Sequence, residues 1–140
     1  MEPLPEALRQ FIADARVCRI ASVRPNGEPH AVPVCPVFDG ERVYVDVSRT
    51  GASGRALQAE PRMTALFDEY DDDWRNLKAV LLRCEAAAVP ADRIEDVWTM
   101  IRRKFPQYGS VGWEPRLTLS LTVYDWRQWG ILEAPQYQPE

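Results

Sequence analysis

Three valine-rich segments near the start of the chain are separated by two short turn signals. The segments cover residues 17–23, 29–38 and 42–47, and Pro25-Asn26-Gly27 and Asp39-Gly40 lie between them. Asn-Gly and Asp-Gly are strong hairpin signals. The hairpin turn that they favour most requires positive φ at both central residues, a conformation that asparagine, aspartate and glycine tolerate. The pattern therefore predicts three consecutive antiparallel strands, and with them a fold rich in β-structure.

Three further strands are predicted along the rest of the chain, at residues 63–70, 78–89 and 117–126. An acidic turn at 71–73 separates the first two. The last strand is the clearest, because apolar residues alternate with threonine and serine from position 117 to 123, at a period of two. The chain is thus expected to contain six strands.

Three helices are expected beside these strands. Apolar residues at helical spacing predict one helix over residues 4–15 and another over 92–105, and the apolar stripe of the second should belong to the core. A short helix is expected between them, because Ser53 is a good helix cap and Pro61 ends the segment. The elements together predict a mainly β fold, a six-stranded antiparallel barrel with flanking helices.

Size and composition fit one compact domain. With 140 residues, 46% of them hydrophobic, residues 1–140 are expected to form a single domain around a sizeable core. No run of 18 apolar residues occurs, and the chain does not begin with a basic segment followed by a long apolar one. We therefore expect no membrane partner and a cytoplasmic location.

The counts of charged and reactive residues disfavour several function classes. Seventeen basic residues against 21 acidic ones give 17 − 21 = −4, which argues against a nucleic-acid partner. The single histidine, His30, excludes a metal centre with two histidines. The three cysteines never form a Cys-x-x-Cys pattern and are expected to be small buried hydrophobes. The acidic residues at 68–73 lack the register of a calcium loop, so no metal is predicted.

Two prolines interrupt the second predicted strand. Pro33 and Pro36 cannot donate to a ladder, so this strand must be an edge, be bulged, or face something other than a strand. A bent barrel strand with prolines at bulges is one interpretation. A ligand lying along the strand is another, and the two are compatible.

The segment from Ser48 to Arg55 is the best place for chemistry. A loop rich in serine and threonine that opens a helix offers free backbone N–H groups and hydroxyls, and Arg49 and Arg55 add positive charge. An anionic group such as a phosphate would be stabilised there. The alternative is an ordinary loop with solvated arginines. The segment matches neither the P-loop nor the dinucleotide glycine pattern.

Four segments of the chain form an ordered set of short motifs. They are Arg19-Ile-Ala-Ser-Val-Arg-Pro-Asn-Gly-Glu-Pro-His-Ala-Val-Pro-Val34, Val45-Asp-Val-Ser-Arg49 leading to Leu57-Gln-Ala-Glu-Pro-Arg62, Val80 to Ala88, and Leu119 to Trp126. In this order they resemble the flavin-binding split-barrel family related to pyridoxamine 5′-phosphate oxidase. The resemblance covers most of residues 10 to 130. It implies a six-stranded Greek-key split barrel that forms a homodimer.

The resemblance also implies a cofactor, FMN or a deazaflavin relative, in grooves between two subunits. The backbone of Val32, Pro33 and Val34 would run along the isoalloxazine edge, and the segment from Val47 to Arg55 would hold the phosphate. The implied cofactor-binding residues are Val32, Pro33, Val34, Val47, Ser48, Arg49, Ser53, Gly54 and Arg55.

The sequence departs from the oxidase pattern at three places. The oxidase would have an arginine where Val32 stands and a lysine where Ser53 stands, and both would contact the phosphate. The carboxy-terminal arginine and histidine motif for the substrate is also missing, because His30 is the only histidine. The resemblance therefore does not extend to oxidation of pyridoxamine phosphate, and Arg49 or Arg55 must replace the missing lysine.

These expectations combine into a small flavin-dependent oxidoreductase that transfers hydride to or from a small molecule. The alternatives are a deazaflavin-dependent reductase and a non-catalytic module that binds flavin or haem in the same groove. No catalytic residue is assigned, because the chemistry needs no acid or base from the chain. His30 shares a strand face with Val32 and Val34 and points either to the groove mouth or to solvent. We expect it to be structural.

Overall fold

The computed structural model describes residues 1–109 and 115–132. The chain is mainly β, with three α-helices and two short 3-10 turns, η1 (Trp74–Asn76) and η2 (Pro106–Gly109). The helices are α1 (Glu6–Asp14), α2 (Ala52–Ala59) and α3 (Ile94–Lys104). The strands are β1 (Cys18–Val23), β2 (Pro29–Val34), β3 (Val37–Phe38), β4 (Arg42–Ser48), β5 (Arg62–Glu69), β6 (Lys78–Ala88) and β7 (Arg116–Trp129).

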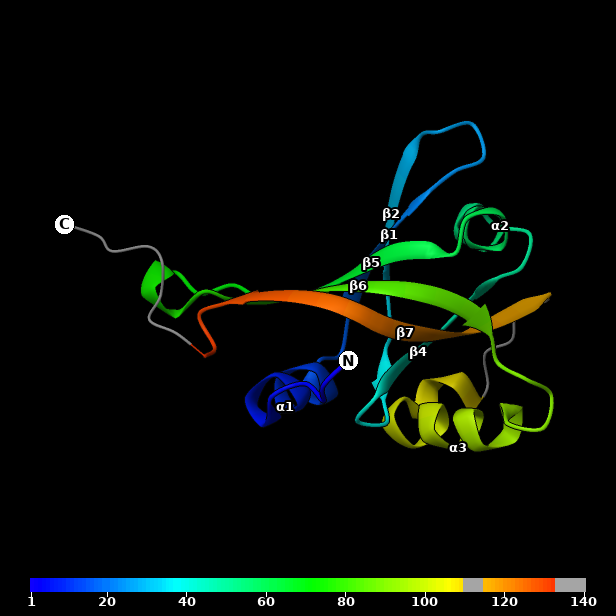
Figure 1. The fold of residues 1–140 in the computed structure, drawn as a ribbon. Coiled ribbons are helices and arrows are strands. Elements are labelled where there is room, and N and C mark those ends of the chain that lie inside the picture. The colour runs from blue at the N-terminus through cyan, green and yellow to red at the C-terminus, as the bar shows by residue number, and fades with distance from the viewer. Residues whose placement is uncertain (110–114, 133–140) are drawn as a thin grey trace.

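All strands belong to one curled antiparallel sheet in the order β2-β1-β5-β6-β7-β4-β3. This architecture agrees with the expected split barrel. In Figure 1, α1 and α3 lie on one side of β6 and β7, whereas α2 lies on the other side. The long β6–β7 hairpin extends away from α3 as an arm. The two edges of the curled sheet are β2 on one side and β3 with β4 on the other. Residues of β2 and β4 line one groove, which is described below.

The structure has seven strands in its described part, and the expected number of six was wrong. The segment 29–38 forms two strands instead of one, because β2 ends at Val34 and β3 begins at Val37. Pro36 lies at this break, where it cannot donate a ladder hydrogen bond. The other proline, Pro33, faces Arg19 within β2, an edge strand that pairs only with β1. The edge interpretation of the proline pattern is therefore confirmed.

The two hairpin turns have positive φ only at their glycines. Gly27 has φ +88° and Gly40 has φ +102°, and within residues 1–109 and 115–132 no other residue type has positive φ. The expectation of positive φ at both central residues was thus wrong. Side chains close the turns instead, because Asn26 Oδ1 accepts a hydrogen bond from the Glu28 N–H at 3.0 Å. Asp39 Oδ1 accepts two from Glu41 and Arg42 in the same way.

Two hydrophobic clusters form the interior. The larger one fills the curled sheet beneath α1, where Leu8 and Ile12 are fully buried. The smaller one joins α3 to β3 and β4, and it contains Val97, Trp98 and Ile101. The stripe predicted for the helix at 92–105 therefore is core. Of the three cysteines, Cys18 and Cys84 are buried as expected, and burial raises the pKa of each thiol to about 12, whereas Cys35 is half-buried.

A lysine at the end of α3 fastens three chain segments together. Lys104 Nζ donates hydrogen bonds to the carbonyl oxygens of Ala13, Ala15 and Pro36, at 2.9, 2.6 and 2.9 Å. Partial burial lowers the pKa of this ammonium group. Because Pro36 lies between β2 and β3, Lys104 fixes the point at which the chain leaves one edge of the sheet for the other.

Candidate functional site

A groove of about 440 Å³ separates the end of β2 from the end of β4. It exists because β3 is only two residues long and pairs with Val43 and Tyr44, so that β4 beyond Tyr44 has β7 as its one strand neighbour. β2 likewise pairs only with β1. Two strand edges are thus left open. Residues from both edges line the groove together with the start of α2.

The open edges give the groove backbone polar groups that the sheet does not use. An edge strand presents N–H and C=O groups to whatever lies beside it. On β2 the exposure alternates, so that His30, Val32 and Val34 are half-buried while Pro29 and Pro33 are exposed. Val32 and Val34 also pack against the larger core cluster. The strand therefore combines an apolar face with a free backbone edge, a surface on which a flat ring system can lie.

The amino-terminal end of α2 closes one end of the groove. The helix begins at Ala52 with Gly51 as its N-cap, and no side chain caps it. The expectation that Ser53 caps this helix was wrong. Ser53 lies inside the first turn, nearly buried, and lines the groove. The N–H groups of the first helical residues have no partner within a helix, so this end attracts an anion.

The structure brings together most of the residues implied by the resemblance. Val32, Pro33, Val34, Val47, Ser48 and Ser53 all line the groove, whereas Arg49, Gly54 and Arg55 do not. Arg49 and Arg55 are exposed beside its end, and Arg55 Nε donates to the Thr50 carbonyl oxygen at 2.8 Å.

Gly54 has a packing role that the structure makes visible. A Cβ atom at this position would lie 2.1 Å from the carbonyl oxygen of Ser48 and 2.9 Å from that of Arg49. Real Cβ atoms do not approach that closely. Gly54 therefore lets α2 come down onto the end of β4, which sets the position of the groove wall.

Sequence reasoning missed four groove residues or left them open, namely His30, Asp46, Gly51 and Ala52. The sequence left open whether His30 points to the groove or to solvent, and in the structure it lines the groove. Gly51 and Ala52 belong to the loop that the sequence indicated, so their position could have been inferred from helix capping. Asp46 gave no signal, because one acidic residue in a valine-rich strand looks like a solvent-facing position.

Asp46 is a buried carboxylate beneath the groove. Its side chain has no exposed surface, and Oδ1 accepts a hydrogen bond from Thr118 Oγ1 at 2.8 Å. The indole N–H of Trp98 donates to the same Thr118 oxygen at 3.0 Å, and Arg116 Nη1 lies 3.4 Å from Oδ2. A buried charge needs such partners. The network ties β4 to β7 and α3 directly before Val47 and Ser48 enter the groove.

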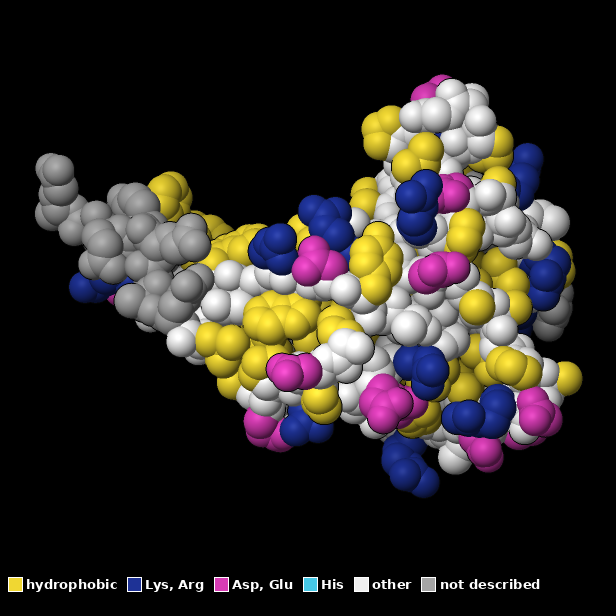
Figure 2. Space-filling view, in the orientation of Figure 1, with side chains coloured by type: hydrophobic (Ala, Val, Ile, Leu, Met, Phe, Trp, Pro, Cys, Tyr) yellow, Lys and Arg dark blue, Asp and Glu magenta, His cyan; other side chains and the backbone are white. Residues whose placement is uncertain are grey.

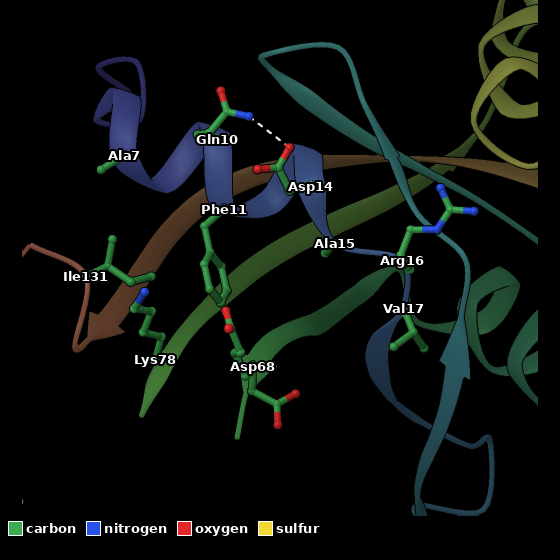
Figure 3. A pocket seen from close by; sticks show the side chains of 11 residues that line it. Ala7, Gln10, Phe11, Asp14, Ala15, Arg16, Val17, Asp68, Lys78 and Ile131 are labelled. Atoms are coloured by element: carbon green, nitrogen blue, oxygen red, sulfur yellow. Dashed lines mark hydrogen bonds between the residues drawn. The ribbon is translucent and has the colours of Figure 1, made fainter. Parts of the chain in front are cut away.

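A larger hollow, of about 490 Å³, lies between α1 and the ends of β5 and β6 (Figure 3). The Phe11 ring points from α1 toward β5, and the Lys78 chain lies beside Ile131. Asp68 forms an ion pair with Arg19 at 2.6 Å. None of the implied cofactor residues lines this hollow, and acidic and basic side chains both border it. We therefore place the candidate site in the groove between β2 and β4.

Two kinds of feature are absent from the described residues. Among residues 1–109 and 115–132, no group of three or more histidine, cysteine, aspartate or glutamate side chains has an arrangement that could hold a metal ion. In the same residues, none of the helices has the length and apolar character that crossing a membrane requires.

Comparison with known proteins places the chain among relatives of one family. The model of the family described as pyridoxamine 5′-phosphate oxidase matches residues 4–130. No curated protein matches the chain significantly.

Three solved structures share the fold at low sequence identity. A heme binding protein from Mycobacterium smegmatis has 18% identity and a TM-score of 0.77, over 92% of this chain and 56% of that one. A FAD-binding protein from Mesorhizobium loti has 17% identity and a TM-score of 0.71, over 91% and 95%. An F420 reductase has 16% identity and a TM-score of 0.69, over 89% and 98%. The chain thus spans only about half the length of the heme binding protein.

Proposed function

Since the chain belongs to the pyridoxamine 5′-phosphate oxidase family, we propose that it is a flavin-dependent oxidoreductase. It binds FMN in the groove between β2 and β4 and transfers hydride to or from a small organic molecule. Its substrate is not pyridoxamine phosphate, because Val32 and Ser53 replace the arginine and lysine expected of the oxidase and the only histidine is His30. We place it in the cytoplasm, where three unpaired cysteines remain reduced.

The observation that carries this proposal is the pair of open strand edges with a helix start at one end. A volume of about 440 Å³ lies in the range of pockets for cofactors of this size. The apolar face of Val32 and Val34 suits a flat ring, and the free backbone edges suit the donors and acceptors of its rim. The start of α2 and the two nearby arginines suit a phosphate. The residues present therefore fit FMN.

When bound, the flavin would supply the hydride chemistry. The chain would bind, orient and shield it. The backbone of Val32 to Val34 would hold the ring edge, and the segment from Val47 to Arg55 would hold the phosphate. The Asp46 network beneath keeps β4 in place, so that the groove does not have to form when the cofactor arrives.

We further propose that the working unit is a homodimer. The groove is open along one side, so one protomer covers only part of a flavin ring. The extended end of the sheet also exposes large hydrophobic side chains, and Figure 2 shows hydrophobic surface along it. These residues are Tyr70, Trp74, Trp129 and Leu132. A second copy would bury such side chains and complete the two grooves at once.

A haem-binding module is the second candidate, and one observation favours it. His30, the only histidine of the chain, lines the groove and could serve as an axial ligand to iron. A deazaflavin in place of FMN is the third. The deazaflavin fits the same groove features, because it also has a flat ring and a phosphate.

The absorption spectrum of the purified protein, before and after incubation with FMN, tests these alternatives. Two bands between 350 and 480 nm support FMN, a single band near the blue end of that range supports a deazaflavin, and a sharp intense band supports haem. Light scattering tests the dimer, for which we expect twice 16.0 kDa. A monomer at micromolar concentration would remove the two-subunit site and with it most of the argument for the cofactor.

A further inference from the structure

A separate pocket of about 360 Å³ lies at the start of α3, against the end of β6 and the neighbouring parts of β4 and β7. It shares no lining residue with the groove between β2 and β4. No part of the proposed flavin site therefore explains it.

The charged residues that line this pocket are both arginines, Arg42 from β4 and Arg93 from the turn before α3. In the described part of the chain, Arg93 forms no ion pair, and Arg42 has one contact, at 3.9 Å, with the carboxylate of Glu41. Both side chains of that pair are largely exposed, so the contact contributes little. The pocket thus has an excess of positive charge.

Tyr44 shares the pocket lining with the two arginines. Its side chain lines the pocket and its hydroxyl donates to Asp39 Oδ2 at 2.9 Å. Burial and the hydrogen bond to the Asp39 carboxylate raise the pKa of Tyr44. The Asp39 carboxylate also accepts hydrogen bonds from the N–H groups of Glu41 and Arg42, and its charge offsets part of that of Arg42, so two arginines stand against one carboxylate.

The position of Arg93 is fixed by its backbone. Its N–H donates to the Pro90 carbonyl oxygen at 2.9 Å, and its own carbonyl oxygen accepts from Val97 at 3.1 Å. Arg42 is held from another side, since its Nε lies 3.4 Å from Thr122 Oγ1. Both arginines thus project into the pocket lining from backbone held in place by hydrogen bonds, and two guanidinium groups can together hold the oxygens of one anion.

The remaining walls are mainly apolar. Ala88, Val89, Pro90 and Val97 contribute hydrocarbon surface, and Ser120 adds a hydroxyl. A bare inorganic anion would leave this surface in contact with water. An anion that carries a small hydrocarbon group would cover it, so the lining favours an organic anion.

We propose that this pocket binds a small organic anion, whose carboxylate or phosphate group lies between Arg42 and Arg93 and whose apolar part rests on Val89, Pro90 and Val97. This goes beyond the proposed flavin function, because it assigns a second ligand site on a different part of the sheet.

Titration calorimetry with four probes tests the ligand class. Benzoate and phenyl phosphate carry both an anionic group and a ring, inorganic phosphate lacks the ring, and benzamide lacks the charge. We expect at least one of the first two to bind at least tenfold more tightly than the last two. Binding of benzamide as tight as that of benzoate, or of inorganic phosphate as tight as that of phenyl phosphate, would overturn the proposal. No binding of either ring-bearing anion at 10 mM would overturn it as well.

Three variants test the location. Arg42→Gln and Arg93→Gln should each weaken the ring-bearing anion about tenfold or more, since each removes a charge-assisted contact. Arg103→Gln on the exposed side of α3 is the matched control and should leave binding unchanged. Ala88→Trp should block the pocket while both arginines remain. Unchanged affinity in both arginine variants, or in Ala88→Trp, would overturn the assignment.

Each variant is also titrated with FMN and heated to its unfolding temperature. We expect both properties to match the unaltered protein, because the pocket and the groove share no residue. If FMN fails to bind to the unaltered protein while benzoate binding follows the pattern above, the flavin proposal fails and this one stands. An arginine variant that keeps its unfolding temperature but loses FMN and benzoate together would overturn the idea of a separate site.

Discussion

The α-carbon of Gly54 in α2 faces the carbonyl oxygen of Ser48 at the end of β4 so closely that an added Cβ atom would lie 2.1 Å from that oxygen. This contact sets the distance between the start of α2 and the end of β4, which both line the groove. Both walls of the proposed phosphate end therefore depend on the absence of one methyl group.

Gly54→Ala should consequently displace α2. We expect the free energy of unfolding to fall by about 1–3 kcal/mol, the usual cost of overpacking. FMN affinity should fall at least tenfold, because the helix start moves away from the phosphate. Urea unfolding and fluorescence titration measure the two effects. Gly109→Ala is the matched control, since a Cβ there meets no atom of the described residues within 4 Å. Equal behaviour of the two variants would contradict the close-contact argument.

The two arginines beside the groove provide the second prediction. A charge-assisted contact to phosphate contributes roughly 1.5–3 kcal/mol, so Arg49→Ala or Arg55→Ala should weaken FMN binding about ten- to a hundredfold. Riboflavin has the same ring without the phosphate, and its affinity should change less than about threefold in either variant. Arg103→Ala on α3 controls for the loss of one positive charge. If both variants keep the unaltered FMN affinity, the phosphate does not lie at this loop.

How much of this site could be predicted depends on how local each interaction is. The Asn26-Gly27 and Asp39-Gly40 signals act within a few residues, and the hairpins formed where the sequence indicated them. The loop from Ser48 to Arg55 likewise lies next to its own strand. By contrast, Pro36 marks the break between β2 and β3, but the position of this break in space is held by Lys104, whose hydrogen bond to the Pro36 carbonyl oxygen spans 68 positions.

The same distinction explains what was missed in the groove. Asp46 is buried because Thr118 and Arg116, about 70 positions later, come to lie beside it when β4 pairs with β7. No local sequence pattern predicts hydrogen-bond partners that are so distant in the chain. The sequence shows a glycine at position 54 but not why a glycine is needed there. The need arises from close contact with the Ser48 carbonyl oxygen, six positions earlier, and this contact forms only because α2 folds back onto β4.

Asp39 makes stability depend on pH in the acid range. Burial raises the pKa of this carboxyl, but hydrogen bonds from the N–H groups of Arg42 and Glu41 and from the Tyr44 hydroxyl outweigh it and hold the pKa below its usual value. A carboxyl with a lowered folded pKa stabilises the fold above the unfolded pKa, near 4, and loses this effect as pH falls through the folded value.

Asp39→Asn should therefore be less stable than the unaltered protein at pH 7, and the difference should shrink at pH 3. Urea unfolding at both pH values measures it. Asp72→Asn removes an exposed carboxylate for which the described residues provide no hydrogen bond, and it should show little difference at either pH. If Asp39→Asn lowers the free energy of unfolding by as much at pH 3 as at pH 7, the lowered pKa of Asp39 does not account for its contribution to stability.

His30 is the groove residue that most invites a catalytic role. It lies on β2 opposite Ser22, half-buried, on the same face as Val32 and Val34. Histidine is a common general acid or base in enzymes. Hydride transfer with a flavin does not require one from the chain, however, and a half-buried ring at a strand edge also serves as a wall.

We expect His30 to form part of the groove wall and to take no part in catalysis. His30→Ala should leave FMN affinity and turnover, measured with NADPH as donor and a dye as acceptor, within about threefold of the unaltered protein. Loss of a general acid would instead lower turnover about a hundredfold or more. A fall of that size with unchanged FMN binding would make His30 catalytic. Loss of haem binding in this variant, from a protein that binds haem and not FMN, would instead support the haem-binding alternative, because the chain offers iron no second histidine.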